Sequence, residues 1–197
     1  MTSVPSRSPR HSRQFVDDCE LTSHELRTDL QLRHVDPLPV LALAELLGTP
    51  VAPLSTLLLD ATHETRQAVQ LLRETEVSSW SAVTVHAPAG RLVVVNDKHL
   101  LGRQNNSVAH ELAHGLLLHQ ALPALDSLGC RRWNQRHEAE ADWLASVLLV
   151  PRTAAERVAR NDWSDAEAGR AYGVSTQLMR WRMNMTAARK YQGARLP

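Results

Sequence analysis

The sequence has few aromatic residues, few cysteines and no long apolar run. Aromatic residues make up 4% of the 197 positions, so a core must be built mostly from Leu, Val and Ala within the 43% hydrophobic fraction. No stretch approaches the roughly 20 apolar residues that span a bilayer. The two cysteines, Cys19 and Cys130, match neither a disulfide framework nor a metal-binding pair, which favours a reducing compartment.

An excess of charge of one sign is also missing. The 22 basic and 21 acidic residues leave a formal charge of +1, which gives the whole chain no electrostatic basis for binding nucleic acid or a membrane surface. Residues 1–13 are rich in Ser, Pro and Arg but lack the apolar segment of a secretory signal. We therefore expect a cytoplasmic protein with no membrane association.

The first half of the chain predicts a tail, two helices and two strands. We expect residues 1–35 to be weakly ordered, with at most a short helix over 22–32. After Pro37 and Pro39, apolar spacing predicts a helix over 40–47 that ends at Gly48. Residues 49–53 read as a connector. The elements expected next are a helix over 60–75, strands over 80–86 and 92–95, and a turn at 88–90 between the strands.

Two further helices follow the strands. One is predicted to be capped by Asn105, Asn106 or Ser107 and to end before Pro123. After a loop over 122–133, a second helix spans about 136–149. This helix must end near Val150, because Pro151 disfavours the α conformation of the residue before it.

The first of these helices carries the motif His110-Glu111-Leu112-Ala113-His114. Residues four apart lie on one helix face, so both imidazoles can reach one ion, and neutral imidazoles suit Zn²⁺. Glu111 is rotated by roughly 100° from His110, so its carboxylate reaches an attacking water rather than the metal. There it can accept a proton and deliver it to the leaving amine. The motif therefore predicts a zinc metallopeptidase with Glu111 as general base.

The rest of this helix argues against plain core packing of the two histidines. A five-residue match can occur by chance, and a histidine pair can be structural. However, burying two imidazoles and a carboxylate costs free energy unless they bind something. The apolar positions that create this environment are Val108, Ala109, Leu112, Ala113, Leu116, Leu117 and Leu118. The metal-binding interpretation is therefore favoured.

The position of the third metal ligand distinguishes the classes of HExxH metallopeptidase. An extended HExxHxxGxxH site is excluded, because Leu117 and Gln120 occupy its glycine and histidine positions. Glu138 and Asp142 share a face of the second helix. We predict that Glu138 completes a His₂Glu site with one open position and that Asp142 accepts a hydrogen bond from a ligand imidazole. Glu140 is the alternative third ligand, and otherwise a solvated carboxylate.

Other residues near the motif give weaker indications. We expect surface or loop positions for three histidines, namely His99, His119 and His137. An oxyanion-stabilising donor should exist, but neither Tyr172 nor Tyr191 can be assigned that role from sequence. The strand Arg91–Val95 either edges the cleft, where a peptide could add as a further strand, or is an ordinary sheet strand.

These motifs together resemble the ImmA/IrrE family of metallopeptidases over roughly residues 37–190. The resemblance rests on the helix at 40–48, on Asn96 after the second strand, and on Gly102-Arg103-Gln104-Asn105 leading into the HExxH motif with His119 closing its helix. It continues in Glu138-Ala139-Glu140-Ala141-Asp142-Trp143-Leu144-Ala145 and Leu148-Leu149-Val150-Pro151. Trp143-Leu144 departs from the family pattern, which has Phe-Ala at the end of the first of these segments.

The resemblance implies a small zincin of the gluzincin type that cleaves a partner protein, a helix-turn-helix transcriptional repressor, and so derepresses its genes. Carried over residue by residue, it makes His110, His114 and Glu138 the metal ligands and Glu111 the catalytic base. The N-terminal tail lies outside the shared pattern.

The C-terminal residues predict further helices. Ser164-Asp165-Ala166-Glu167 is a capping box, Gly173 makes a turn, and Ser175 caps another helix. This pair resembles a helix-turn-helix, and Arg180, Arg182, Arg189 and Lys190 make its second helix basic. Because one basic helix in a nearly neutral chain supports only weak binding to DNA, we favour a helical region that shapes access of the substrate.

The sequence therefore predicts an α+β fold: a zincin-like domain over 36–152 with a short β-sheet packed on the HExxH helix, followed by a C-terminal helical region over 153–197. The alternative function is a non-catalytic regulator that binds DNA or protein, with a structural zinc. Glu111 argues against it, since a structural site needs four protein ligands and no base. A broad housekeeping peptidase is a third, less favoured reading.

Overall fold

The computed structural model describes residues 11–58, 80–87, 90–119 and 134–191. The predicted helix over 60–75, most of the turn at 88–90 and the loop over 122–133 lie outside the described residues. The elements are α1 (Arg13–Asp29), α2 (Val40–Leu46), β1 (Val51–Pro53), a 3₁₀ turn η1 (Thr56–Leu58), β2 (Ala82–Ala87), β3 (Gly90–Val95), α4 (Leu101–Leu116), α5 (Gln135–Leu149), α6 (Arg152–Arg160), α7 (Asp165–Ala171), α8 (Thr176–Thr186) and η2 (Ala188–Tyr191).

The described strands form a three-stranded sheet in the order β1-β3-β2. The two predicted strands are confirmed as an antiparallel pair in which Thr84 lies opposite Val93. β1 pairs parallel with β3, and sequence analysis missed it because Pro50 and Pro53 flank a run of two residues. Since β3 is the central strand, the suggestion that Arg91–Val95 edges the cleft is wrong. Within the described residues, β1 and β2 are the two edge strands.

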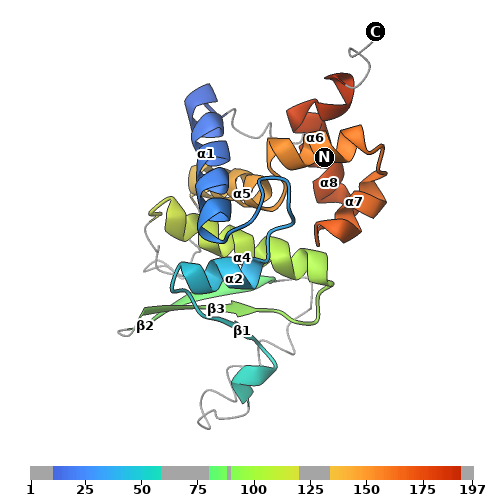
Figure 1. Cartoon of the computed structure of the whole chain (residues 1–197). Helices are drawn as coiled ribbons and strands as arrows, with labels where there is room; N and C mark the ends of the chain where they lie inside the picture. The colour runs from blue at the N-terminus through green and yellow to red at the C-terminus, as the bar shows by residue number, and fades with distance from the viewer. Residues whose placement is uncertain (1–10, 59–79, 88–89, 120–133, 192–197) are drawn as a thin grey trace, which may run out of the picture.

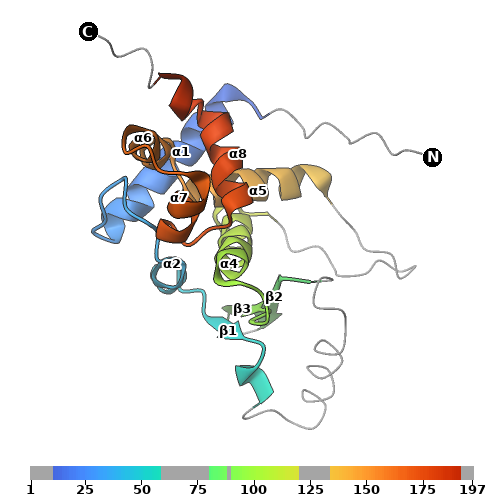
Figure 2. The same ribbon diagram turned by 90° about the vertical axis from the view of Figure 1, so that its right-hand side faces the viewer.

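The helices stack in layers on one face of this sheet. Figure 1 shows α4 lying across the sheet, with α1, α5 and the C-terminal helices beyond it, and Figure 2 shows α4 nearly end-on between the sheet and those helices. One cluster of buried side chains runs from Cys19 on α1 to Ala188 on η2. The predicted α+β class is confirmed, and α4 lies between the sheet and α5.

The helix α4 begins earlier than predicted. Its N-cap is Leu100, which has extended backbone and makes no side-chain cap. The residues expected to cap it bond elsewhere: Asn105 Nδ2 donates to the Gly173 carbonyl, and Ser107 Oγ donates to the Arg103 carbonyl. The Asn105 contact ties the helix that carries the HExxH motif to the turn between α7 and α8, so the position of this helix does not depend on the sheet alone.

The N-terminal region differs from the weakly ordered segment predicted over residues 1–35. Residues 13–29 form a helix that Ser12 caps by accepting a hydrogen bond from the Phe15 N–H. On the face of α1 toward α5, Arg27 is fully buried and donates to Ser23 Oγ at 2.6 Å and to the Leu148 carbonyl at 2.7 Å. The sequence concealed this packing, because a buried arginine breaks the apolar pattern of the helix.

The burial of α1 makes a chemical prediction for Cys19. Its thiol is buried, and burial raises its pKa to about 12. Since the thiolate is the reactive form, iodoacetamide at pH 8 should leave Cys19 unmodified in the native protein and modify it in urea. Mass spectrometry of the peptide that contains Cys19 measures this. Rapid labelling of the native chain would contradict the packing of α1.

The C-terminal helices α7 and α8 join through a tight turn at Gly173, which has φ of +63°. The capping box at Ser164 and Glu167 and the cap at Ser175 are both confirmed. The basic character predicted for α8 is reduced, since Arg182 is buried and both Arg180 and Arg189 pair with Asp165. A DNA-binding role for this helix-turn-helix-like pair therefore stays a prediction, and the surface charge that would favour it is smaller than the sequence indicated.

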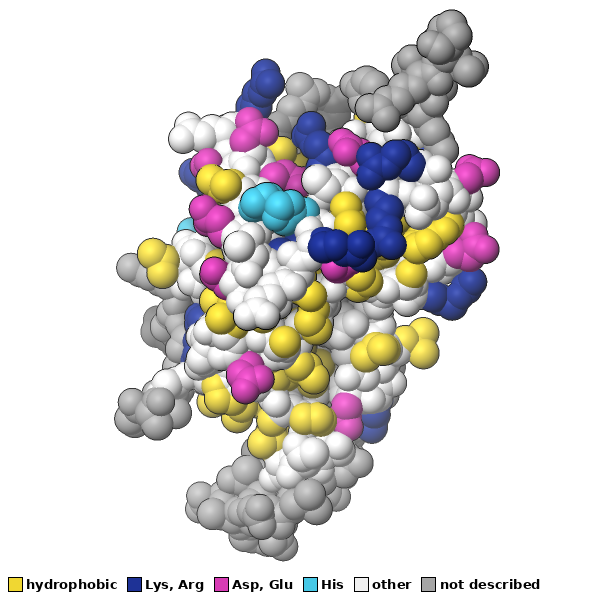
Figure 3. Space-filling model, in the orientation of Figure 1, with side chains coloured by type: hydrophobic (Ala, Val, Ile, Leu, Met, Phe, Trp, Pro, Cys, Tyr) yellow, Lys and Arg dark blue, Asp and Glu magenta, His cyan; other side chains and the backbone are white. Residues whose placement is uncertain are grey.

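The face of the molecule drawn in Figure 3 carries side chains of both charges. On the side shown in Figure 3, basic and acidic side chains lie among one another.

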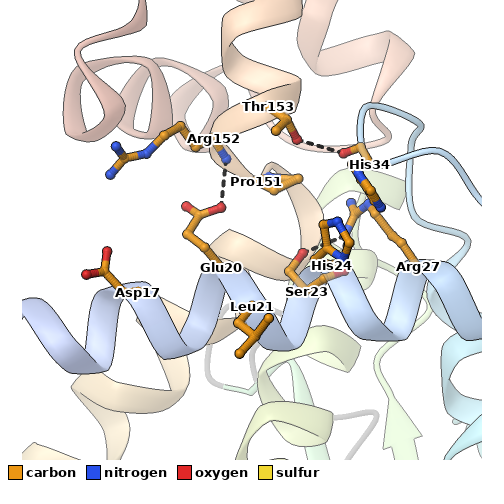
Figure 4. Close-up of a pocket in the computed structure, with 10 residues that line it drawn as sticks. All are labelled: Asp17, Glu20, Leu21, Ser23, His24, Arg27, His34, Pro151, Arg152 and Thr153. Carbon is orange, nitrogen blue, oxygen red and sulfur yellow. Dashed lines mark hydrogen bonds between the residues drawn. The ribbon is translucent and has the colours of Figure 1, made fainter.

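A cavity of about 350 Å³ opens between α1 and the start of α6, and Figure 4 shows its lining, which contains no residue of the HExxH motif. No helix among the described residues is long and apolar enough to cross a membrane.

Candidate metal centre

Two neighbouring helices bring the predicted ligands together. His110 and His114 lie one turn apart on α4, and Glu138 projects from the first turn of α5. α5 begins where Asn134 accepts hydrogen bonds from the Arg136 and His137 N–H groups, so the cap fixes the turn that carries Glu138. Within the described residues, His110, His114 and Glu138 form a group whose donor atoms lie within 4.8 Å of one another.

The spacing of these atoms fits a metal ion. The Nε2 atoms of His110 and His114 are 3.0 Å apart, and Glu138 oxygens lie 3.2 Å from the first and 3.6 Å from the second. Ligands held tetrahedrally at about 2.0–2.1 Å from an ion lie about 3.3 Å apart. The three side chains therefore form a donor set compatible with one divalent ion. Glu140 is outside this group.

The charges of the group are strongly coupled. Burial opposes protonation of His110, but its hydrogen bonds to Asp142 and Glu138 outweigh burial and raise its pKa to about 10. Burial and the neighbouring His110 lower the pKa of His114. The hydrogen bond from His110 lowers the pKa of Glu138. Without metal, a proton on His110 therefore balances the Glu138 carboxylate, and an ion would take the place of that proton.

The second ring nitrogen of His110 has the contact predicted for it. Nδ1 lies 2.8 Å from Asp142 Oδ1, one turn along α5 from Glu138. A hydrogen bond from Nδ1–H leaves Nε2 with its lone pair toward the metal position. The Asp142 side chain is 72% exposed, so water competes for this bond.

The second ring nitrogen of His114 has a contact that sequence analysis missed. Its Nδ1 lies 3.0 Å from Nδ1 of His119, whose Nε2 is 3.3 Å from Glu140 Oε2. The side chain of His119 is 7% exposed and that of Glu140 is 17% exposed, so neither is the surface group expected from sequence. The spacing of Glu138 and Glu140 on α5 placed them on different faces but could not indicate that His119 folds back between α4 and α5.

The carboxylate of Glu111, the candidate general base, contacts the sheet. It lies on α4 one residue after His110, and Thr84 Oγ1 on the edge strand β2 donates a short hydrogen bond to Glu111 Oε2. This bond ties the Glu111 carboxylate to the edge strand β2. Thr84 was not singled out from the sequence, because its partner comes from the helix that packs on the sheet.

The side chain of Arg91 packs closely against Gly115, next to the HExxH motif. Gly115, the residue after His114, has no Cβ, and a Cβ there would lie 1.9 Å from Arg91 Nη1. Arg91 Nε donates to Thr49 Oγ1 at 2.8 Å, so the guanidinium lies across α4 at the turn of His114. Tyr172, considered as an oxyanion donor, is buried and donates instead to the Val35 carbonyl.

An HExxH helix packed on a small sheet, with a glutamate from a second helix beside its two histidines, is compatible with the zincin class of metallopeptidases. Comparison with family models places the chain more narrowly. Residues 59–184 match the model of peptidase family M78, described as the IrrE N-terminal-like domain, and the chain belongs to this ImmA/IrrE family. The family confirms the resemblance seen in the sequence and supports metallopeptidase activity. No curated protein matches the chain.

Proposed function

We propose that the protein is a cytoplasmic zinc-dependent endopeptidase that cleaves a helix-turn-helix transcriptional repressor. The observation that carries the proposal is the convergence of His110 Nε2, His114 Nε2 and the Glu138 carboxylate, with Glu111 next to His110 on α4. The ligand set, two imidazoles and one carboxylate, is one that catalytic zinc sites use, and it leaves a coordination position open.

The proposed chemistry divides between the ion and the chain. Zinc held by His110, His114 and Glu138 would supply Lewis acidity to water and to the scissile carbonyl. Glu111 accepts the proton of the attacking water and returns it to the leaving amine. Thr84 holds the Glu111 carboxylate by donating to one oxygen, which leaves the other oxygen free to accept that proton.

The edge strand β2 supports an extended peptide as substrate. Its outer backbone edge is unpaired within the described residues, and Thr84 in its middle contacts Glu111. A peptide added along this edge would gain main-chain hydrogen bonds and lie beside the proposed base. The edge therefore replaces Arg91–Val95 as the proposed substrate strand.

The repressor part of the proposal rests on the family. Membership supports a protein substrate, and the resemblance in the sequence points to a helix-turn-helix repressor. A cleavage enzyme for such repressors acts in the compartment of the genome, which agrees with the proposed cytoplasmic location. We assign the C-terminal helices to access of the substrate rather than to DNA, since the guanidinium of Arg182 is inside the core.

The test measures metal and cleavage together. After loading with zinc and removal of excess ion, mass spectrometry should find about one zinc per chain. Incubation with helix-turn-helix repressors encoded in the same genome should cut one of them at a single site, and a chelator should stop the cleavage until zinc is restored. Binding without cleavage of any repressor would contradict the substrate class, and the absence of bound zinc would contradict the metal centre.

A further inference from the structure

The contacts behind His114 form a continuous chain of polar groups. His114 Nδ1 faces His119 Nδ1 at 3.0 Å, His119 Nε2 faces Glu140 Oε2 at 3.3 Å, and Arg136 Nε donates to Glu140 Oε1 at 2.8 Å. The ring of His119 also stacks on His137, with centroids 4.2 Å apart and planes 6° from parallel. The chain starts at a proposed ligand and reaches solvent at Arg136, whose side chain is 82% exposed.

When His114 binds a metal through Nε2, each hydrogen bond in this series has a defined donor and acceptor. That role leaves the lone pair on Nε2 and the proton on Nδ1, so His114 donates to His119 Nδ1. A neutral His119 that accepts at Nδ1 carries its proton on Nε2, which faces the Glu140 carboxylate. Glu140 accepts from both His119 and Arg136, so every donor in the series faces an acceptor.

We propose that His119 and Glu140 are positioning residues that hold His114 in the tautomer and orientation required of a metal ligand. The proposal rests on the proposed function, because it concerns the same metal centre. It gives Glu140 a role different from that of third ligand. Glu140 contacts His119 and not the ligand His114 itself, and Arg136 donates to its other oxygen.

Because its side chains are more buried, the series of hydrogen bonds behind His114 should contribute more to metal binding than the contact of Asp142 with His110. The side chains of His119 and Glu140 are 7% and 17% exposed, whereas that of Asp142 is 72% exposed. A hydrogen bond shielded from water is stronger than the same bond in contact with water, and an unmade partner costs more when it is buried. The loss of the His114 chain should therefore weaken metal binding more than the loss of Asp142.

The experiment measures the zinc affinity of the full chain by competition with a chromophoric chelator. His119→Leu removes the acceptor for His114 Nδ1–H, and Glu140→Gln keeps the shape but removes the charge that favours Nε2–H on His119. Each should raise the Kd for zinc roughly 10–100-fold. In His119→Asn, the side-chain oxygen can still accept from His114, so this variant should recover part of the affinity. The absorption spectrum of Co²⁺ in the same variants reports the ligand geometry independently of activity.

Two controls define the result. Glu156→Gln changes an exposed glutamate on α6 and should leave the Kd unchanged, and Asp142→Asn should weaken binding less than Glu140→Gln. Zinc affinity of the wild-type value in both His119→Leu and Glu140→Gln would overturn the proposal, whereas a loss in Asp142→Asn equal to that in Glu140→Gln would overturn the ranking of the two contacts by burial. If the wild type itself bound no zinc, the proposed function would fail. If it bound zinc and cleaved a repressor while His119→Leu bound equally well, only the positioning role would fail.

Discussion

Glu111→Gln should bind zinc as the wild type does and cleave its substrate roughly 10²–10⁴-fold more slowly. The reason is chemical rather than structural. Glu111 is outside the group of three converging donors, so its charge does not hold the ion. An amide keeps the shape of the side chain and still accepts from Thr84, but it cannot take a proton from water.

The measurement is a single-turnover cleavage rate at saturating enzyme, with zinc content determined on the same sample. Glu156→Gln, the same substitution at an exposed position on α6, is the matched control and should cleave at the wild-type rate. Wild-type cleavage by Glu111→Gln would exclude Glu111 as general base. Loss of zinc from this variant would instead assign Glu111 to the metal and would leave the base unidentified.

The convergence of His110, His114 and Glu138 was predictable in part because the geometry of the two histidines is local. The separation of His110 from His114 is one helical turn, so recognising the helix is enough to place both imidazoles on one face. The position of Glu138 depended on one further inference, that the helix ending at Pro151 packs against the first. The structure brings that glutamate, and not Glu140, beside the two imidazoles.

The surroundings of the group were not predictable in the same way. Thr84 meets Glu111 only because the register of β2 against β3 and the packing of α4 on the sheet place them together. His119 follows the end of α4, where Leu118 adopts a positive φ of 54°, and this reversal turns His119 toward α5. Periodicity describes one element at a time, so contacts between elements and after a turn escape it.

Buried arginines were the other failure of sequence reasoning. Arg182 seemed to make α8 basic, because arginine is usually exposed. In the structure its side chain is 1% exposed and its guanidinium donates to the Val150 carbonyl and to Glu20, both at 2.8 Å. Charge counted along the sequence therefore overstated the surface charge of this helix.

The same contacts make the second large prediction: Glu20→Ala should lower the free energy of unfolding by about 2–4 kcal/mol. Burial lowers the pKa of Arg182, but Glu20 opposes this, so the guanidinium stays charged inside the core. Removing the carboxylate leaves that charge without its partner. It also removes the acceptor for the Arg152 N–H at the start of α6, a contact visible in Figure 4. The remaining exposure of Glu20 keeps the cost below the largest values for buried pairs.

Urea unfolding at a fixed zinc concentration measures this effect, because bound metal adds its own stability. Glu25→Ala, an exposed glutamate on the same helix, is the control and should change the free energy by less than about 0.5 kcal/mol. In an Arg182→Met background the charge is gone, so Glu20→Ala should cost about 1–3 kcal/mol less than it does in the wild type. Equal costs in both backgrounds would show that Glu20 stabilises the protein through α6 and not through Arg182. Because neither residue belongs to the metal-binding group, every variant that remains folded should still bind one zinc.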